Sequence, residues 1–135
     1  MKVLYSMLCE NANERQDGRL DVHGVFTQLY APGFPAQQDT MTLIVVMEWA
    51  EGERGDIPFA IDLLDPSGSP VGTINGQSTV SDGPAFAGPP QTRVVMELNG
   101  VVFPVPGAYE FSLKALETQT SLTWLHLIEN PGAVN

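Results

Sequence analysis

The sequence predicts an all-β protein built from two packed antiparallel sheets. The main observation is the segment over residues 103–114, in which Tyr109, Phe111 and Leu113 alternate with polar residues after a Pro-Gly turn. Alternation with period two is typical of a strand that lies on a core and has its other face in water. No segment shows a convincing helical spacing of apolar residues. The 13 glycines and 11 prolines agree with many turns.

The spacing before this strand narrows the fold class. Apolar residues precede Tyr109 as they do around the tyrosine corner of immunoglobulin-like domains, where the tyrosine hydroxyl bonds back to the connecting backbone. Phe111 stands where such domains often carry a cysteine. We therefore expect an immunoglobulin-like two-sheet antiparallel β-sandwich of about eight strands. Its predicted shared core is Met96, Leu98, Tyr109, Phe111 and Leu113.

The N-terminal part predicts two strands and a crossing loop. Residues 3–9 form a short apolar strand, and the dipeptide Asp17-Gly18 marks a tight turn before a strand over residues 20–30. Gly24 interrupts the alternation, which indicates a bulge or a close backbone approach where the strand changes face. Phe34, which lies between two prolines, is expected to close one end of the core.

Residues 42–49 are apolar at nearly every position, as in a central strand covered on both faces. An edge strand covered by a partner chain would show the same pattern. The cover is expected from the chain's own loops, residues 31–40 or 81–90, or from a twofold partner in a homodimer. The candidate interface residues are Leu43, Val45, Met47 and Trp49.

The C-terminal half predicts the remaining strands. Asp65-Pro66-Ser67-Gly68 indicates a type I turn, Asn75-Gly76 interrupts a weaker strand, and a hairpin turn is expected over residues 117–120. The Gly/Pro-rich loop over residues 81–90 has no assigned structure. By length, residues 1–135 form a single domain. The predicted strands cover residues 58–64, 71–80, 93–98, 108–116 and 122–128.

Charge and composition exclude several classes of partner. With 16 acidic and six basic residues, the net charge is -10, and this charge repels nucleic acid and anionic membrane surfaces. A single cysteine indicates a reducing compartment. The apolar run over residues 3–9 is too short, and its flank too polar, for a signal peptide. We therefore expect a cytoplasmic protein.

No catalytic or cofactor motif is visible. His23 and His126 have no cysteine, histidine or carboxylate at metal-ligand spacing, so structural or surface roles are favoured. Cys9 is expected in the core, because single buried cysteines are common there. An enzyme would need a site that folding assembles from these three residues. No catalytic residue, cofactor or metal is assigned from the sequence.

Acidic residues raise a calcium-binding alternative. Glu48, Glu51, Glu53 and Asp56 cluster between two strands, but the loop lacks the alternating ligand pattern of a loop-type calcium site, so a solvated acidic loop is favoured. Arg54-Gly55-Asp56 is interpreted as a turn. Trp49 and Trp124 are each candidates for the core, its rim or a protein interface.

Two motifs resemble a known family. Asp17-Gly18-Arg19-Leu20 with Gly24-Val25-Phe26, and Phe103-Pro104-x-Pro106-Gly107-x-Tyr109-x-Phe111, are similar to segments shared by small bacterial proteins of unknown function. The chain departs from that family at residues 117–120, where the family pattern implies a shorter turn that contains glycine. The resemblance implies a single cytosolic β-sandwich and supplies no activity.

The function that these features favour is a non-enzymatic binding or assembly module that acts through protein-protein contacts. The chain is rich in strand and turn residues and has no recognisable catalytic spacing. A β-sandwich that binds a small molecule or calcium, or an enzyme with a site assembled by folding, is the alternative. A flat apolar patch in the folded protein would favour binding, and a pocket with a histidine beside a carboxylate or Cys9 would favour catalysis.

Overall fold

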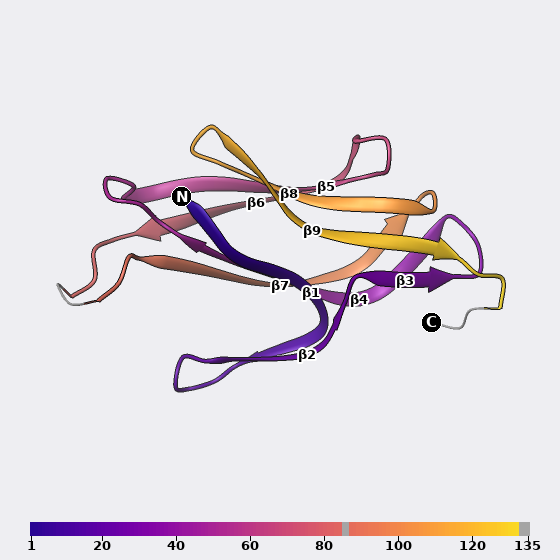
Figure 1. Ribbon diagram of the computed structural model, residues 1–135, viewed down its shortest axis with the longest axis horizontal. Coiled ribbons are helices and arrows are strands. Elements are labelled where there is room, and N and C mark those ends of the chain that lie inside the picture. Colours follow the sequence, from indigo (N-terminus) through magenta and orange to yellow (C-terminus); the bar gives the residue numbers. More distant parts are fainter. Residues whose placement is uncertain (85–86, 133–135) are drawn as a thin grey trace.

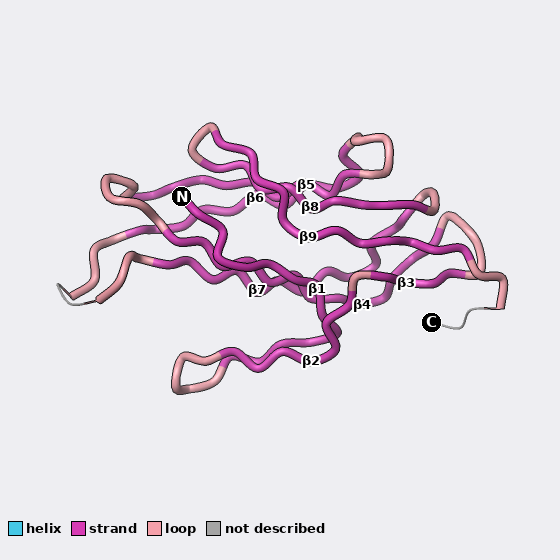
Figure 2. Tube along the Cα trace, in the orientation of Figure 1, coloured by secondary structure: helices cyan, strands magenta, loops and turns pink. Residues whose placement is uncertain are grey.

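The computed structural model describes residues 1–84 and 87–132 and contains nine strands and no helix within them. The chain runs through two layers of strands (Figure 1), and turns connect most of the strands (Figure 2). None of the described residues belongs to a helix that could cross a membrane. The strands are β1 (Lys2–Glu14), β2 (Leu20–Phe26), β3 (Gln28–Ala31), β4 (Ala36–Glu48), β5 (Gly55–Leu64), β6 (Pro70–Val80), β7 (Gln91–Phe103), β8 (Gly107–Ala115) and β9 (Thr118–Glu129).

The strands form a four-stranded sheet in the order β2-β1-β4-β7 and a five-stranded sheet in the order β3-β9-β8-β5-β6. Neighbouring strands are antiparallel except β3 and β9, which pair in parallel. The prediction of an all-β protein with two sheets is confirmed, whereas the prediction of purely antiparallel pairing is wrong at this one edge.

The predicted strand over residues 20–30 is two strands in different sheets. The break falls at Thr27, so β2 stays with the first sheet and β3 joins the second. Gly24, where we expected the change of face, lies inside β2 with a φ of 69°. A Cβ there would lie 2.6 Å from the carboxyl carbon of Glu10. The glycine therefore permits a close approach to the neighbouring strand, while the change of sheet happens three residues later.

The main core lies between the two sheets. Alternate residues of β8 point into it, and Tyr109, Phe111 and Leu113 are buried there as predicted. The rings of Phe103 and Tyr109 meet edge to face, with centroids 5.0 Å apart. Leu98 packs against this core while half-buried, and Met96 is also half-buried. The predicted core residues are thus buried on β8 and only half-buried on β7.

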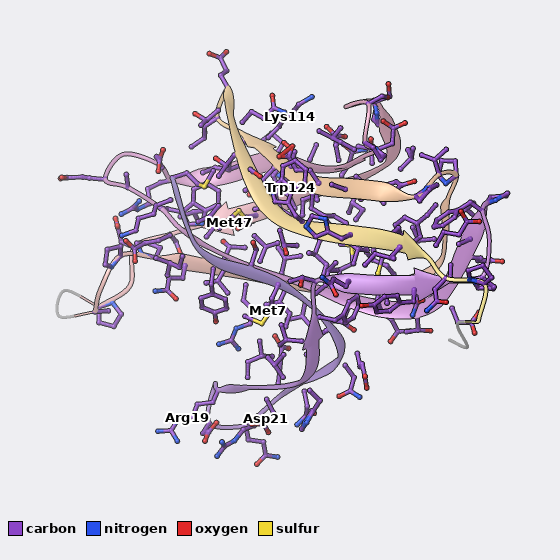
Figure 3. All side chains as sticks on the ribbon, turned by 45° about the vertical axis from the view of Figure 1, so that its right-hand side comes forward. Met7, Arg19, Asp21, Met47, Lys114 and Trp124 are labelled. Atoms are coloured by element: carbon purple, nitrogen blue, oxygen red, sulfur yellow. The ribbon has the colours of Figure 1, made fainter. Side chains whose placement is uncertain are left out.

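A second apolar cluster explains why residues 42–49 are apolar on both faces. Ile44 and Val46 point away from the main core and pack with Cys9. The hairpin of β1 and β2 covers this outer face, because β1 pairs with β4 over its first half and with β2 over its second half. Figure 3 shows Met7 between the sheet and the hairpin, with Arg19 and Asp21 near the hairpin's far end.

Arg93 of β7 ties the tip of this hairpin to the sheet. Its guanidinium donates a 2.9 Å hydrogen bond to the carbonyl of Gly18 and lies 3.9 Å from a carboxylate oxygen of Glu14. The cover of the second face therefore comes from the chain's own hairpin. Of the two loops predicted as cover, residues 36–40 of the first belong to β4, and residues 85 and 86 of the second lie outside the described residues.

Candidate interaction surface

Among the described strands, each sheet has two edge strands, β2 and β7 in one sheet and β3 and β6 in the other. The β6 and β7 edges lie side by side. The inner face of β6 is buried near its end, at Ser78 and Val80, but Gly72 is exposed and Ile74 is only half-buried. On β7, Val94 and Leu98 pack on the core while remaining half-buried. The sandwich is therefore open along this side.

An apolar groove of about 390 Å³ lies at this opening. Ile61 and Leu63 of β5 and Phe111 of β8 form its floor. Val71 on the β6 rim is 38% exposed and Val102 on the β7 rim is 50% exposed. No charged side chain contributes to the lining. The lining residues are Ile61, Leu63, Val71, Gly72, Thr73, Ile74, Leu98, Gly100, Val101, Val102 and Phe111.

Hydrogen bonds close the other end of this opening. The hydroxyl groups of Ser78 on β6 and Thr92 on β7 lie 2.6 Å apart, and the indole N–H of Trp49 donates to Thr92 Oγ1 at 2.8 Å. Trp49 and Ser78 are buried. These polar contacts fix the separation of the two edges at one end. They therefore also restrain the strands that form the groove at the other end.

Two glycines shape the open side. At Gly76 on β6, a Cβ would collide with the Phe59 ring, so only glycine lets that ring pack beneath the strand. At Gly100 the φ of 66° puts a kink into β7. Leu98 points inward before this kink and Val101 packs on the core after it. The kink therefore keeps apolar side chains facing the groove along both parts of β7.

The charges on these edges are few. β6 contains no charged residue; it begins with Pro70, and its pairing with β5 is irregular at that end, two features that commonly protect edge strands. β7 has two charged residues, of which Arg93 holds the hairpin tip. The other, Glu97, is exposed and has no ion pair or side-chain hydrogen bond with the described residues. The β7 edge thus presents a single carboxylate without a cation of its own.

The four candidate interface residues lie elsewhere. Leu43, Val45, Met47 and Trp49 are at most 1% exposed and belong to the main core within one chain. Their burial accounts for the apolar run without a partner chain. Sequence reasoning missed the groove because its lining comes from four strands distant in sequence. The sequence did contain one signal of the groove. β7 has more apolar residues than a strand needs when one face packs on a core and the other face is in water.

The residues of the enzyme alternative are not brought together. Cys9 is fully buried, its thiol lies 3.7 Å from the carbonyl oxygen of Thr42, and burial raises its pKa above the ordinary value. His23 and His126 are exposed on β2 and β9. Among the described residues, neither histidine side chain forms a hydrogen bond with the thiol or with a carboxylate.

Two carboxylates at or near the predicted acidic loop have hydrogen-bond partners of their own. Asp56 accepts a hydrogen bond from Thr79, and Asp65 accepts bonds within its turn from Ser67 and Ser69. The described part of the chain contains no group of three histidine, cysteine or acidic residues that could hold a metal ion. Arg54 bonds to Asp82 at 2.7 Å and to the carbonyl of Ala50. The Arg-Gly-Asp tripeptide therefore braces neighbouring segments.

Comparison with known families gives one result. The model of DUF6941, a family of unknown function, matches residues 4–127. The chain belongs to this family. The match confirms the resemblance to a family of unknown function that the sequence indicated. No curated protein matches the chain. Function must therefore be inferred from the open edges and the groove, because the family's description names no activity.

Proposed function

We propose that this protein is a non-enzymatic protein-binding module that takes up an extended segment of a partner protein at the groove between β6 and β7. The observation that carries the proposal is an apolar groove of about 390 Å³ beside an unpaired strand edge. Extended peptides commonly bind to such edges by adding a strand, in which main-chain hydrogen bonds give affinity and side-chain pockets give specificity.

The position of the groove favours addition to β7. A strand beside β7 would extend the four-stranded sheet and lie over the inner face of β6, where Gly72 is exposed and Ile74 half-buried. Its inward side chains would pack against Leu98 and Val101. At about 3.3 Å per residue, the part of β7 from Met96 to Phe103 would pair with a segment about 23 Å long.

We also propose a more specific fold class, a cellular location and an origin for the protein. The Tyr109 hydroxyl bonds to the backbone of Val105, as in the tyrosine corner of immunoglobulin-like domains, and this supports an immunoglobulin-like sandwich formed as one domain. The single cysteine supports a cytoplasmic location. The Phe-Pro-x-Pro-Gly-x-Tyr-x-Phe turn supports a bacterial origin.

Self-association is the other assembly that the sequence suggested. Pairing through Leu43, Val45, Met47 and Trp49 would require four core side chains to leave the interior. The open β6 and β7 edges need no such rearrangement. We therefore place the partner at these edges.

A displayed library of random linear peptides tests the proposal. Selected binders should perturb the backbone amide NMR signals of β6 and β7 most strongly, and Gly72→Trp should abolish their binding by filling the groove. A Cβ at Gly72 meets no atom within 4 Å, so the backbone there has room for a side chain that extends into the groove. Gly33→Trp is the matched control, because Gly33 is equally unobstructed and lies outside the groove.

Two results would contradict the proposal. One is a set of selected peptides whose NMR perturbations lie away from β6 and β7. The other is binding that survives in Gly72→Trp as well as it does in Gly33→Trp.

A further inference from the structure

We infer that the captured segment carries an apolar-basic-apolar triplet, with a lysine or arginine between two apolar residues. This inference rests on the proposed binding of a strand to β7. It follows from the order of side chains on that edge, where Glu97 lies between Met96 and Leu98.

The register of β7 with β4 places these three side chains. Met96 pairs with Leu43 and Leu98 pairs with Met41, both of which are core residues, so Met96 and Leu98 belong to the inner face. Glu97 pairs with Thr42 between them and belongs to the outer face. Because directly opposite residues of paired strands share a face, an added strand would meet two apolar positions and one acidic position.

The carboxylate of Glu97 is available for a partner. Arg93 on the same strand holds Gly18 in the hairpin, and Lys114 on β8 of the other sheet lies 3.3 Å from Asp62. Glu97 has no ion pair among the described residues, and the chain carries a net charge of -10. A basic residue opposite Glu97 is therefore attracted both by its cross-strand neighbour and by the overall field.

Charge also disfavours a second copy of this chain as the occupant. Glu97 is the middle residue of β7, which runs from Gln91 to Phe103. Antiparallel pairing of two whole β7 strands about a twofold axis would set Glu97 opposite its own copy. Like charges directly opposite one another destabilise paired strands, and both chains would carry the same net charge. A basic segment has neither problem.

The triplet reads the same in both directions, so the inference holds for parallel and antiparallel addition. Two capped synthetic peptides test it, Thr-Thr-Val-Lys-Val-Thr-Thr and the same peptide with glutamate in place of lysine. Binding is measured by fluorescence anisotropy at low salt, where surface charges are least screened. We expect the lysine peptide to bind the parent protein about fivefold more tightly than the glutamate peptide.

Charge reversal on the protein gives the decisive comparison. Glu97→Lys should reverse the preference between the two peptides. Asp39→Lys changes the net charge equally from an exposed position on β4, and it should leave the lysine peptide preferred. Gly72→Trp should weaken both peptides because it fills the groove.

The outcomes separate this inference from the function on which it rests. Equal binding of the two peptides, or an unchanged preference in Glu97→Lys, overturns the triplet, while strand capture stands if Gly72→Trp still weakens both. If neither peptide binds at its solubility limit, or if binding is unchanged in Gly72→Trp, strand capture at the groove is itself wrong.

Discussion

The hydroxyl of Tyr109 holds the backbone of Val105 through two hydrogen bonds. It donates to the Val105 carbonyl oxygen at 2.7 Å and accepts from the Val105 N–H at 3.1 Å. Tyr109 is buried, so its ring anchors the turn between β7 and β8 to the core. Burial also raises the pKa of its phenol above the ordinary value.

Replacing this hydroxyl should cost measurable stability. We expect Tyr109→Phe to lower the free energy of unfolding by about 1 to 2 kcal/mol, because both bonds to Val105 are lost while the ring remains. Urea denaturation at neutral pH measures the change. Tyr5→Phe is the control, since the Tyr5 hydroxyl bonds to none of the described residues. Equal stability of the two variants would show that the turn does not depend on these bonds.

Phe111 supports both the core and the floor of the groove. Phe111→Ala should lower the free energy of unfolding by about 3 to 5 kcal/mol, because it removes buried apolar surface and leaves a cavity. Chemical denaturation followed by tryptophan fluorescence measures the loss. Val25→Ala, at a 59% exposed position on β2, should change stability by less than about 0.5 kcal/mol. A Phe111→Ala variant as stable as the parent would contradict the assigned core.

The core residues of β8 could be predicted from the sequence, whereas the cover of the second face and the groove could not. One physical cause explains both outcomes. Tyr109, Phe111 and Leu113 could be placed from the sequence because the alternation of a strand is local. The cover over Ile44 and Val46 depends on where a distant hairpin folds, and the groove depends on which strands end at the edges of the two sheets. Neither arrangement follows from the spacing of residues along one strand.

Asp62 gives a pH-dependent contribution to stability. The hydrogen bond from Thr73 and then the contact with Lys114 hold its pKa below the ordinary value of 3.8, although burial acts in the opposite direction. A lowered folded-state pKa means that the stabilisation is present above pH 3.8 and is lost as the pH falls through the folded value.

We therefore expect Asp62→Asn to lower the free energy of unfolding by about 1 kcal/mol at neutral pH. The difference from the parent should shrink as the pH is taken below 3.8. Urea denaturation at a series of pH values measures both effects. Asp39→Asn, at an exposed carboxylate without side-chain hydrogen bonds among the described residues, should show no such trend. A constant difference at all pH values would contradict the role of the charged carboxylate.

The reactivity of the Cys9 thiol measures how firmly the hairpin of β1 and β2 covers it. Because the thiol is fully buried and its pKa is raised, we expect almost no reaction with Ellman's reagent in the native protein. Arg93→Ala removes the bonds to Gly18 and Glu14 and should speed the reaction severalfold by loosening the hairpin tip. Arg19→Ala changes an exposed arginine of the same hairpin and should leave the rate unchanged. Equal rates in both variants would exclude a clamping role for Arg93.

Val45 tests the self-association that the sequence suggested. Glutamate at this fully buried position should abolish cooperative unfolding, because a carboxylate would lie in the main core. Circular dichroism and sedimentation at micromolar concentration follow folding and oligomeric state together. A dimeric parent from which Val45→Glu yields a folded monomer would support the interface at Leu43, Val45, Met47 and Trp49.

The parallel pairing of β3 with β9 has a consequence for the order in which the protein is made. Gln28 pairs with His126, so the five-stranded sheet can be completed only after β9 has been synthesised. Until then β8 has no neighbour at the edge where β9 will pair, and β3 has no sheet to join. Pairings between residues so distant in sequence form slowly, and unpaired edges favour aggregation. A nascent chain that stalls before β9 is therefore the form of this protein with the greatest need of a chaperone.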